Sequence, residues 1–166
     1  MAAHAANNLT KSQNCAIIIT ESMKGHAMKK RFFKEAKKES HLSDYEGAHL
    51  GAIAVYKDKI ILARAHNTAK TNTTQYYYNR YRMEDKNDIM LKPARAHAET
   101  NLYRKIRWLD VDFKDVIIYV YRELKDGTLA ESKCCKSCEH LLRDLGVRTI
   151  CYTTRGGYVE EKFYKE

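Results

Sequence analysis

Histidine, glutamate and cysteine side chains gather in two short stretches of this chain. "LKPARAHAETNLYRK" contains His97 and Glu99, and "AESKCCKSCEHLLRD", further along, contains Cys135 and Cys138. Imidazole and thiolate are ligands that Zn²⁺ prefers, and a catalytic zinc site uses three protein ligands and keeps the fourth position for water. The two stretches therefore predict one zinc site formed by His97, Cys135 and Cys138.

The spacing of these residues fits the starts of two helices. Cys135 and Cys138 stand at positions i and i+3, which share a helix face, so both thiolates can reach one metal ion. A helix N-terminus also stabilises thiolates through the positive end of its dipole. Glu99 is two positions after His97 and lies on another face, where its carboxylate can take a proton from a bound water and pass it to a leaving group. This combination predicts hydrolytic chemistry with a proton shuttle.

A second arrangement of the metal ligands stays open at this point. Cys134 directly precedes Cys135 and is four positions from Cys138, so it could also bind the metal. A closed, zinc-ribbon-like site would need a fourth protein ligand such as Cys134 or His140. That site would leave Glu99 without a role, so the catalytic arrangement is favoured. The other two cysteines, Cys15 and Cys151, are expected to be core thiols.

Length, charge and cysteine usage narrow the class of protein. The 166 residues are 44% hydrophobic, which suits one folded domain with its own core. The net charge of +9 favours phosphorylated or polyanionic partners, although many soluble proteins are also basic. Clustered cysteines suit a metal site in a reducing compartment, and "CAIII" is too short to span a membrane. We expect an intracellular, cytoplasmic protein without a membrane segment.

The hydrophobic patterns predict a sheet with helices packed on it. Residues 1–20 are expected to be a flexible or partly ordered leader, and residues 21–166 a single domain. The expected elements, in chain order, are a helix over 21–40, a hairpin of strands 51–56 and 60–65, a helix over 94–108 that starts after Pro93, a buried strand over 115–122, a helix over 134–146 closed by Gly146, and strands over 147–153 and 158–164.

The two metal-binding stretches resemble a known signature. Zinc-dependent nucleobase deaminases carry H-x-E followed later by P-C-x-x-C, and this chain has "HAE" at 97–99 and "CCKSC" at 134–138, separated by one predicted strand. The chain therefore resembles the cytidine/deoxycytidylate deaminase superfamily. The resemblance implies a three-layer α-β-α sandwich around a mixed sheet of about five strands. It also implies one Zn²⁺ per chain, with His97, Cys135 and Cys138 as ligands and Glu99 as the proton shuttle.

The resemblance also implies substrate contacts and marks one departure. The family's first hairpin often ends in an asparagine that contacts the substrate sugar, and Asn67 stands in the matching place. Ala98, within the "HAE" motif, is expected to contact the substrate as well. Cys134 occupies the position where the family usually has proline.

The expected reaction is hydrolytic deamination of a cytosine-type base, carried by cytidine, deoxycytidine or their nucleotides, with release of ammonia. The last two predicted strands are joined by a Gly-Gly turn and should be antiparallel. Such an ending resembles the free-nucleoside branch of the superfamily, whose members are often homo-oligomers. The interpretation therefore favours a small pyrimidine substrate.

Two alternatives come from other function classes. "TTQYYYNRYR" could stack bases and hold phosphates of single-stranded DNA or RNA, as in a polynucleotide cytosine or adenine deaminase, although packing of the tyrosines explains the pattern equally well. The second alternative is a non-catalytic, zinc-stabilised module that binds nucleic acid. The residues proposed for nucleic-acid contacts are Tyr78, Arg80, Tyr81 and Arg82.

Overall fold

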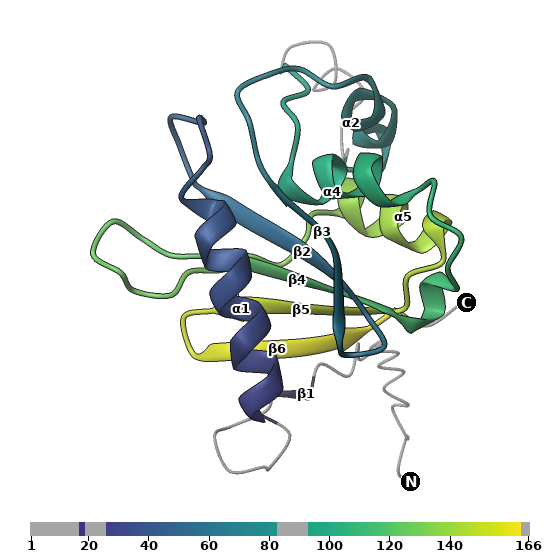
Figure 1. Cartoon of the computed structure of the whole chain (residues 1–166). Coiled ribbons are helices and arrows are strands. Elements are labelled where there is room, and N and C mark those ends of the chain that lie inside the picture. The colour runs from purple at the N-terminus through teal and green to yellow at the C-terminus, as the bar shows by residue number, and fades with distance from the viewer. Residues whose placement is uncertain (1–16, 19–25, 83–92, 164–166) are drawn as a thin grey trace, which may run out of the picture.

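A mixed six-stranded sheet forms the centre of the molecule (Figure 1). The computed structural model describes residues 17–18, 26–82 and 93–163. The strands are β1 (Ile17–Ile18), β2 (Leu50–Tyr56), β3 (Ile60–His66), β4 (Val116–Arg122), β5 (Thr149–Thr154) and β6 (Gly157–Lys162), in the spatial order β1-β6-β5-β4-β2-β3. The helices are α1 (His26–Ser40), α2 (Thr73–Tyr78), the 3₁₀ helix η1 (Asn79–Arg82), α4 (Ala98–Ile106), the 3₁₀ helix η2 (Phe113–Asp115) and α5 (Lys136–Leu145).

The strand directions confirm the predicted topology. β4 and β5 are the parallel pair, and the other described pairs are antiparallel. β5 and β6 form the expected terminal hairpin, closed at Thr154 and Gly157. In the first hairpin, Lys57 and Asp58 both have positive φ, as the two central residues of a type I′ turn require. The backbone twist of such a turn matches the twist of the two strands that it joins. Among the described residues, no helix combines the length and apolar character that crossing a bilayer requires.

Helices cover both faces of the sheet and make the three expected layers (Figure 1). On one face, α1 buries Phe32, Phe33 and Ala36 against side chains of β2, β4 and β5, and both phenylalanine rings lie 5.2 Å from the Tyr119 ring. The backbone of α1 approaches β2 so closely at Gly51 that a Cβ there would meet the Ala36 carbonyl. On the opposite face, apolar residues of α4 and α5 pack against the other side of the same strands.

The helix after Pro93 begins later than predicted. Residues 94–96 are extended because they pair with residues 68–72: Thr68 N donates to Ala96 O at 3.0 Å and Asn72 N to Ala94 O at 2.8 Å. α4 therefore starts only at Ala98. The prediction that Pro93 opens this helix was wrong, because the extended pairing uses the backbone groups that an earlier helical turn would need.

Three further expectations meet the structure as follows. α5 starts at Lys136 rather than at 134, and it ends at Gly146, whose φ of 102° gives the left-handed cap that the sequence predicted. The polar segment after Asn67, for which no helix was predicted, contains α2 and η1. The expected leader, the first residues of the expected 21–40 helix and Cys15 lie outside the described residues, apart from Ile17 and Ile18, which pair with β6.

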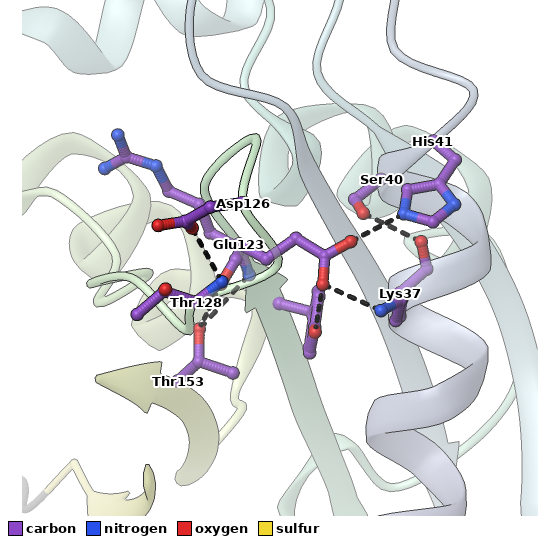
Figure 2. A network of polar contacts seen from close by, with 9 residues as sticks. Lys37, Ser40, His41, Glu123, Asp126, Thr128 and Thr153 are labelled. Carbon is purple, nitrogen blue, oxygen red and sulfur yellow. Dashed lines mark hydrogen bonds and ion pairs between the residues drawn. The ribbon is translucent and has the colours of Figure 1, made fainter. Parts of the chain in front are cut away.

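A partly buried carboxylate ties α1 to the end of β4 (Figure 2). Glu123 Oε2 accepts hydrogen bonds from Lys37 Nζ at 2.7 Å and from the Tyr121 hydroxyl at 2.8 Å, and Oε1 pairs with His41 Nε2 at 2.8 Å. Burial alone would raise the pKa of Glu123, but these three partners together lower it to about 2. The network fixes the chain where it leaves β4 and enters the 124–135 loop.

Replacing Glu123 by glutamine is expected to weaken folding in a pH-dependent way. A carboxyl with a lowered folded-state pKa stabilises the fold fully above its unfolded value, near 4.5, and this contribution fades as the pH falls toward 2. We expect Glu123→Gln to lower the free energy of unfolding by about 1–2 kcal/mol at pH 7, after allowance for solvent screening around the partly exposed Lys37. Urea unfolding at pH 7, 5 and 3 checks this. An equal loss at all three pH values would contradict it.

Candidate metal centre and the cavity beside it

His97 and Cys135 occupy equivalent positions at the starts of two neighbouring helices. His97 is the N-cap of α4 and Cys135 is the N-cap of α5, both with extended backbone, and neither side chain caps its own helix. Residues that usually occupy this position direct an oxygen to the first-turn N–H groups. The His97 and Cys135 side chains do not cap their helices in this way. They approach each other between the two helix starts instead.

The three expected ligands meet at one point. Nδ1 of His97 lies 3.5 Å from Cys135 Sγ and 3.4 Å from Cys138 Sγ. With Zn–N near 2.0 Å and Zn–S near 2.3 Å, tetrahedral geometry places two such ligand atoms about 3.5 Å apart. The observed separations therefore fit one Zn²⁺ held by these three side chains. In the described part of the chain, they form the one group of histidine, cysteine and acidic side chains close enough to share a metal ion.

The environment favours a thiolate at Cys135. The hydrogen bond with the Cys138 thiol and the contact with His97 outweigh burial and lower the pKa of Cys135 to about 3. The same hydrogen bond, with full burial, raises the pKa of Cys138. Burial acts to lower the pKa of His97, but the Cys135 contact raises it overall. A metal ion competes with these protons for the same three atoms.

Glu99 stands beside the three ligands with one carboxylate oxygen unused. The side chain is 2% exposed, and its Oε2 is buried without a hydrogen-bond partner among the described residues. Burial raises the pKa of Glu99, with the positive charge of His97 acting in the opposite direction. A raised pKa makes the carboxylate a better proton acceptor, as a group that takes a proton and returns it requires. The unpartnered oxygen leaves room for a water or a substrate group.

Gln75 links the two metal-binding helices through α2. Its Oε1 accepts hydrogen bonds from the Thr100 hydroxyl at 2.5 Å and from His97 N at 3.4 Å. Its Nε2 donates to Asn79 Oδ1 at 2.8 Å, and Ser137 in α5 donates to that oxygen at 3.2 Å. The chain of contacts fixes the two helix starts relative to each other. Sequence reasoning missed it, since no local spacing relates Gln75 to either helix.

The alternative fourth ligands lie outside this cluster. Cys134 is buried in the core that α4 and α5 share with the sheet, and its pKa is raised by burial, so it resembles a packed thiol more than a metal ligand. The His140 ring stacks on Tyr81 with 3.9 Å between ring centroids. Neither belongs to the group formed by His97, Cys135 and Cys138. The geometry thus favours the open, three-ligand arrangement and assigns Cys135 the ligand position.

A cavity of about 580 Å³ opens directly onto the site. His97, Glu99 and Cys135 form part of its wall, so the metal position and the Glu99 side chain border the same space. This volume falls in the range of roughly 300–1,000 Å³ that small-molecule sites occupy. Side chains from η1, from the extended segment before α4, from the end of β4 and from the 124–135 loop also line the wall. Those used below are Arg82, Arg95, Arg122, Glu131 and Lys133.

Both predicted substrate contacts also line the cavity. Asn67 Oδ1 accepts from Leu50 N at 2.8 Å and its Nδ2 donates to Ala48 O at 2.7 Å, so the side chain is fixed across the ends of β2 and β3. One of the two amide protons remains for a ligand. Ala98, the first residue of α4, offers its backbone there.

The four aromatic and basic residues from η1 and its surroundings separate into two groups. Arg82 lines the cavity. Tyr78, Arg80 and Tyr81 are not part of its wall: the Tyr78 hydroxyl donates to Asp144 at 2.8 Å, and the Arg80 guanidinium lies over the Tyr77 and Tyr81 rings. These three side chains therefore pack along α5 and on each other, and their contact with a nucleic acid stays a prediction.

Comparison with protein families agrees with this geometry. Residues 26–154 match the family model described as "Cytidine and deoxycytidylate deaminase zinc-binding region". The chain belongs to the cytidine and deoxycytidylate deaminase family. Its members are zinc-dependent deaminases, so the zinc centre and the hydrolytic deamination of a cytosine-type base are those of the family. No curated protein matches the chain by sequence.

Solved structures of other deaminases share the fold of this family member. The dCMP deaminase of the cyanophage S-TIM5 has 21% identity over 78% of this chain and 84% of its own, with a TM-score of 0.53. The same enzyme in complex with dCMP and dUMP has 22% identity and the same TM-score, covering 78% of this chain and 82% of its own. Cytidine deaminase from Burkholderia pseudomallei has 18% identity over 84% of this chain and 93% of its own, with a TM-score of 0.51.

Proposed function

We propose that this protein hydrolyses the exocyclic amino group of a cytosine base in a small pyrimidine nucleoside or nucleotide, producing the uracil form and ammonia. The buried Glu99 side chain carries the proposal: it lines the same cavity as His97 and Cys135, and its Oε2 has no hydrogen-bond partner among the described residues. The similar fold of a dCMP deaminase that binds dCMP and dUMP supports a cytosine-type substrate, since these two nucleotides differ at the group that deamination replaces.

His97, Cys135 and Cys138 would hold the metal, and Glu99 would move the protons. A bound Zn²⁺ supplies a Lewis acid that lowers the pKa of a coordinated water to about 7. Glu99 accepts the proton of the attacking water while the water oxygen bonds to C4 of the ring. It would pass that proton to ring N3, and would then carry the remaining hydroxyl proton to the amino nitrogen, so that C4=O forms, the C4–N bond breaks and ammonia leaves. The buried position of Glu99 keeps bulk water from taking over this transfer.

Asn67 and Ala98 would orient the substrate against Glu99. The remaining Asn67 amide proton can bond a sugar hydroxyl, and its fixed side chain makes that contact without a loss of rotamer freedom. The backbone of Ala98, adjacent to Glu99 at the start of α4, can bond the polar edge of the base. Holding the base by both ends aligns C4 with the reacting water.

A panel of cytosine and purine compounds tests the proposal. We expect the zinc-loaded protein to release ammonia from at least one of cytidine, deoxycytidine and their monophosphates, with little from adenosine or guanosine. Ammonia release and the absorbance change on forming uracil are measured together, and a metal-stripped sample is the control. If no member of the panel, including cytosine in single-stranded DNA and RNA, is turned over, the proposal fails and a non-catalytic zinc module becomes the better account.

A further inference from the structure

Three arginines from three separate elements line the cavity. Arg82 ends η1, Arg95 lies in the extended segment before α4, and Arg122 ends β4. In the part of the chain that the structure describes, no carboxylate lies within ion-pair distance of any of them. Like charges around a shared cavity repel, and an anionic ligand relieves this repulsion.

The other charged residues of the cavity do not neutralise them. Lys133 is paired with the Glu161 carboxylate at 2.7 Å, so its charge is already balanced. Glu99 is buried at the metal centre. Glu131 is solvent-exposed, and its side chain accepts a hydrogen bond from Lys133 N at 3.4 Å. Among the described residues of the wall, the unbalanced charge therefore comes from the three guanidinium groups.

Arg122 is the most firmly positioned of the three. Thr153 Oγ1 accepts from Arg122 N at 3.1 Å and donates to its carbonyl oxygen at 3.2 Å, which fixes the backbone. The guanidinium Nη1 donates to Glu131 O at 3.3 Å, and Nε is buried without a partner among the described residues. A buried, unused N–H donor costs free energy unless a ligand accepts from it. Guanidinium groups fit phosphate oxygens with paired hydrogen bonds, unlike a point-like ammonium.

We propose that Arg82, Arg95 and Arg122 form a phosphate subsite, and that the preferred substrate is a cytosine nucleoside monophosphate. The proposal rests on the proposed function and names its substrate class. A terminal phosphate carries about −1.5 to −2 charges at pH 7, which suits three guanidinium groups that have no carboxylate partner among the described residues. An internucleotide phosphodiester carries a single negative charge and would leave more of the cationic charge unbalanced.

Steady-state kinetics on matched substrates tests the subsite. We expect kcat/KM of the zinc-loaded protein to be at least about 100-fold higher for dCMP or CMP than for the corresponding nucleoside, since each charge-assisted hydrogen bond contributes about 10–100-fold. Arg122→Gln and Arg95→Gln should each lower kcat/KM for the monophosphate by about 10–100-fold and leave the nucleoside rate nearly unchanged. Arg104→Gln, an exposed arginine on α4 outside the cavity wall, is the control and should change neither.

The outcomes separate the subsite from the proposed function. Turnover of nucleosides with no preference for monophosphates would overturn the subsite and leave the deaminase proposal intact. Turnover of cytosine only in oligonucleotides would overturn it as well. Absence of turnover with every substrate would overturn both. Zinc content and thermal unfolding of each variant show whether it is folded, and inhibition of nucleoside turnover by inorganic phosphate, weaker in Arg95→Gln, tests the subsite if Arg122→Gln does not fold.

Discussion

Replacing Glu99 by glutamine should lower kcat by about 10²–10⁴-fold, the usual contribution of a positioned general acid–base group, while one zinc per chain stays bound. The glutamine side chain has almost the same shape, so the buried site should remain packed, but an amide cannot accept and return the proton. Glu99 is not among the three side chains that converge on the metal position, so the metal affinity should change little. Ammonia release and elemental analysis of zinc measure the two effects separately.

Glu139→Gln provides the matched control for the Glu99 variant. Glu139 lies in the first turn of the other metal-binding helix, but its carboxylate pairs with Lys136 at 3.2 Å and Arg143 at 3.3 Å and does not line the cavity. We expect this variant to retain near-wild-type kcat. A Glu99→Gln protein that still turns over at the wild-type rate, or one that has lost its zinc, would contradict the assigned role.

The adjacent cysteines should respond very differently to the same substitution. We expect Cys135→Ser to lose both bound zinc and turnover, because a serine hydroxyl is a poor zinc ligand and one of only three protein ligands is removed. The loss of affinity should exceed the roughly 10–100-fold that follows removal of an outer hydrogen-bond partner of a ligand. Titration with a chromogenic chelator measures this affinity.

Cys134→Ser is the control for the ligand assignment. The Cys134 side chain is 6% exposed and packs in the core with α4 and α5, so serine should cost some stability by burying a hydroxyl but leave zinc and turnover in place. Cys138→Ser should behave like Cys135→Ser. If Cys134→Ser loses the metal and Cys135→Ser keeps it, Cys134 rather than Cys135 is the zinc ligand, and the ligand assignment is wrong.

The local parts of the site were predictable because they depend on short spacings. The i, i+3 separation of Cys135 and Cys138 places two thiols on one helix face in any fold, and Glu99 avoids the ligand position for the same geometric reason. The short apolar runs of β2, β3, β4 and β5 likewise indicate which segments become strands, and Gly146 marks a helix end. The predicted helix starts failed where residues 94–96 found extended partners far away in the chain.

Only the tertiary structure decided the contacts between residues that are distant in the sequence. Gln75 reaches His97 and Thr100 because α2 packs beside the metal-binding helices, and Arg122 enters the cavity because Thr153 fixes the end of β4. Of the tyrosine- and arginine-rich segment, the fold brings Arg82 to the cavity and turns the neighbouring tyrosines toward α5. The sequence by itself predicted the candidate zinc ligands and the candidate proton shuttle, since chemistry at fixed local spacing needs no knowledge of packing. The walls that would choose the substrate depend on long-range packing, so no local pattern could reveal them.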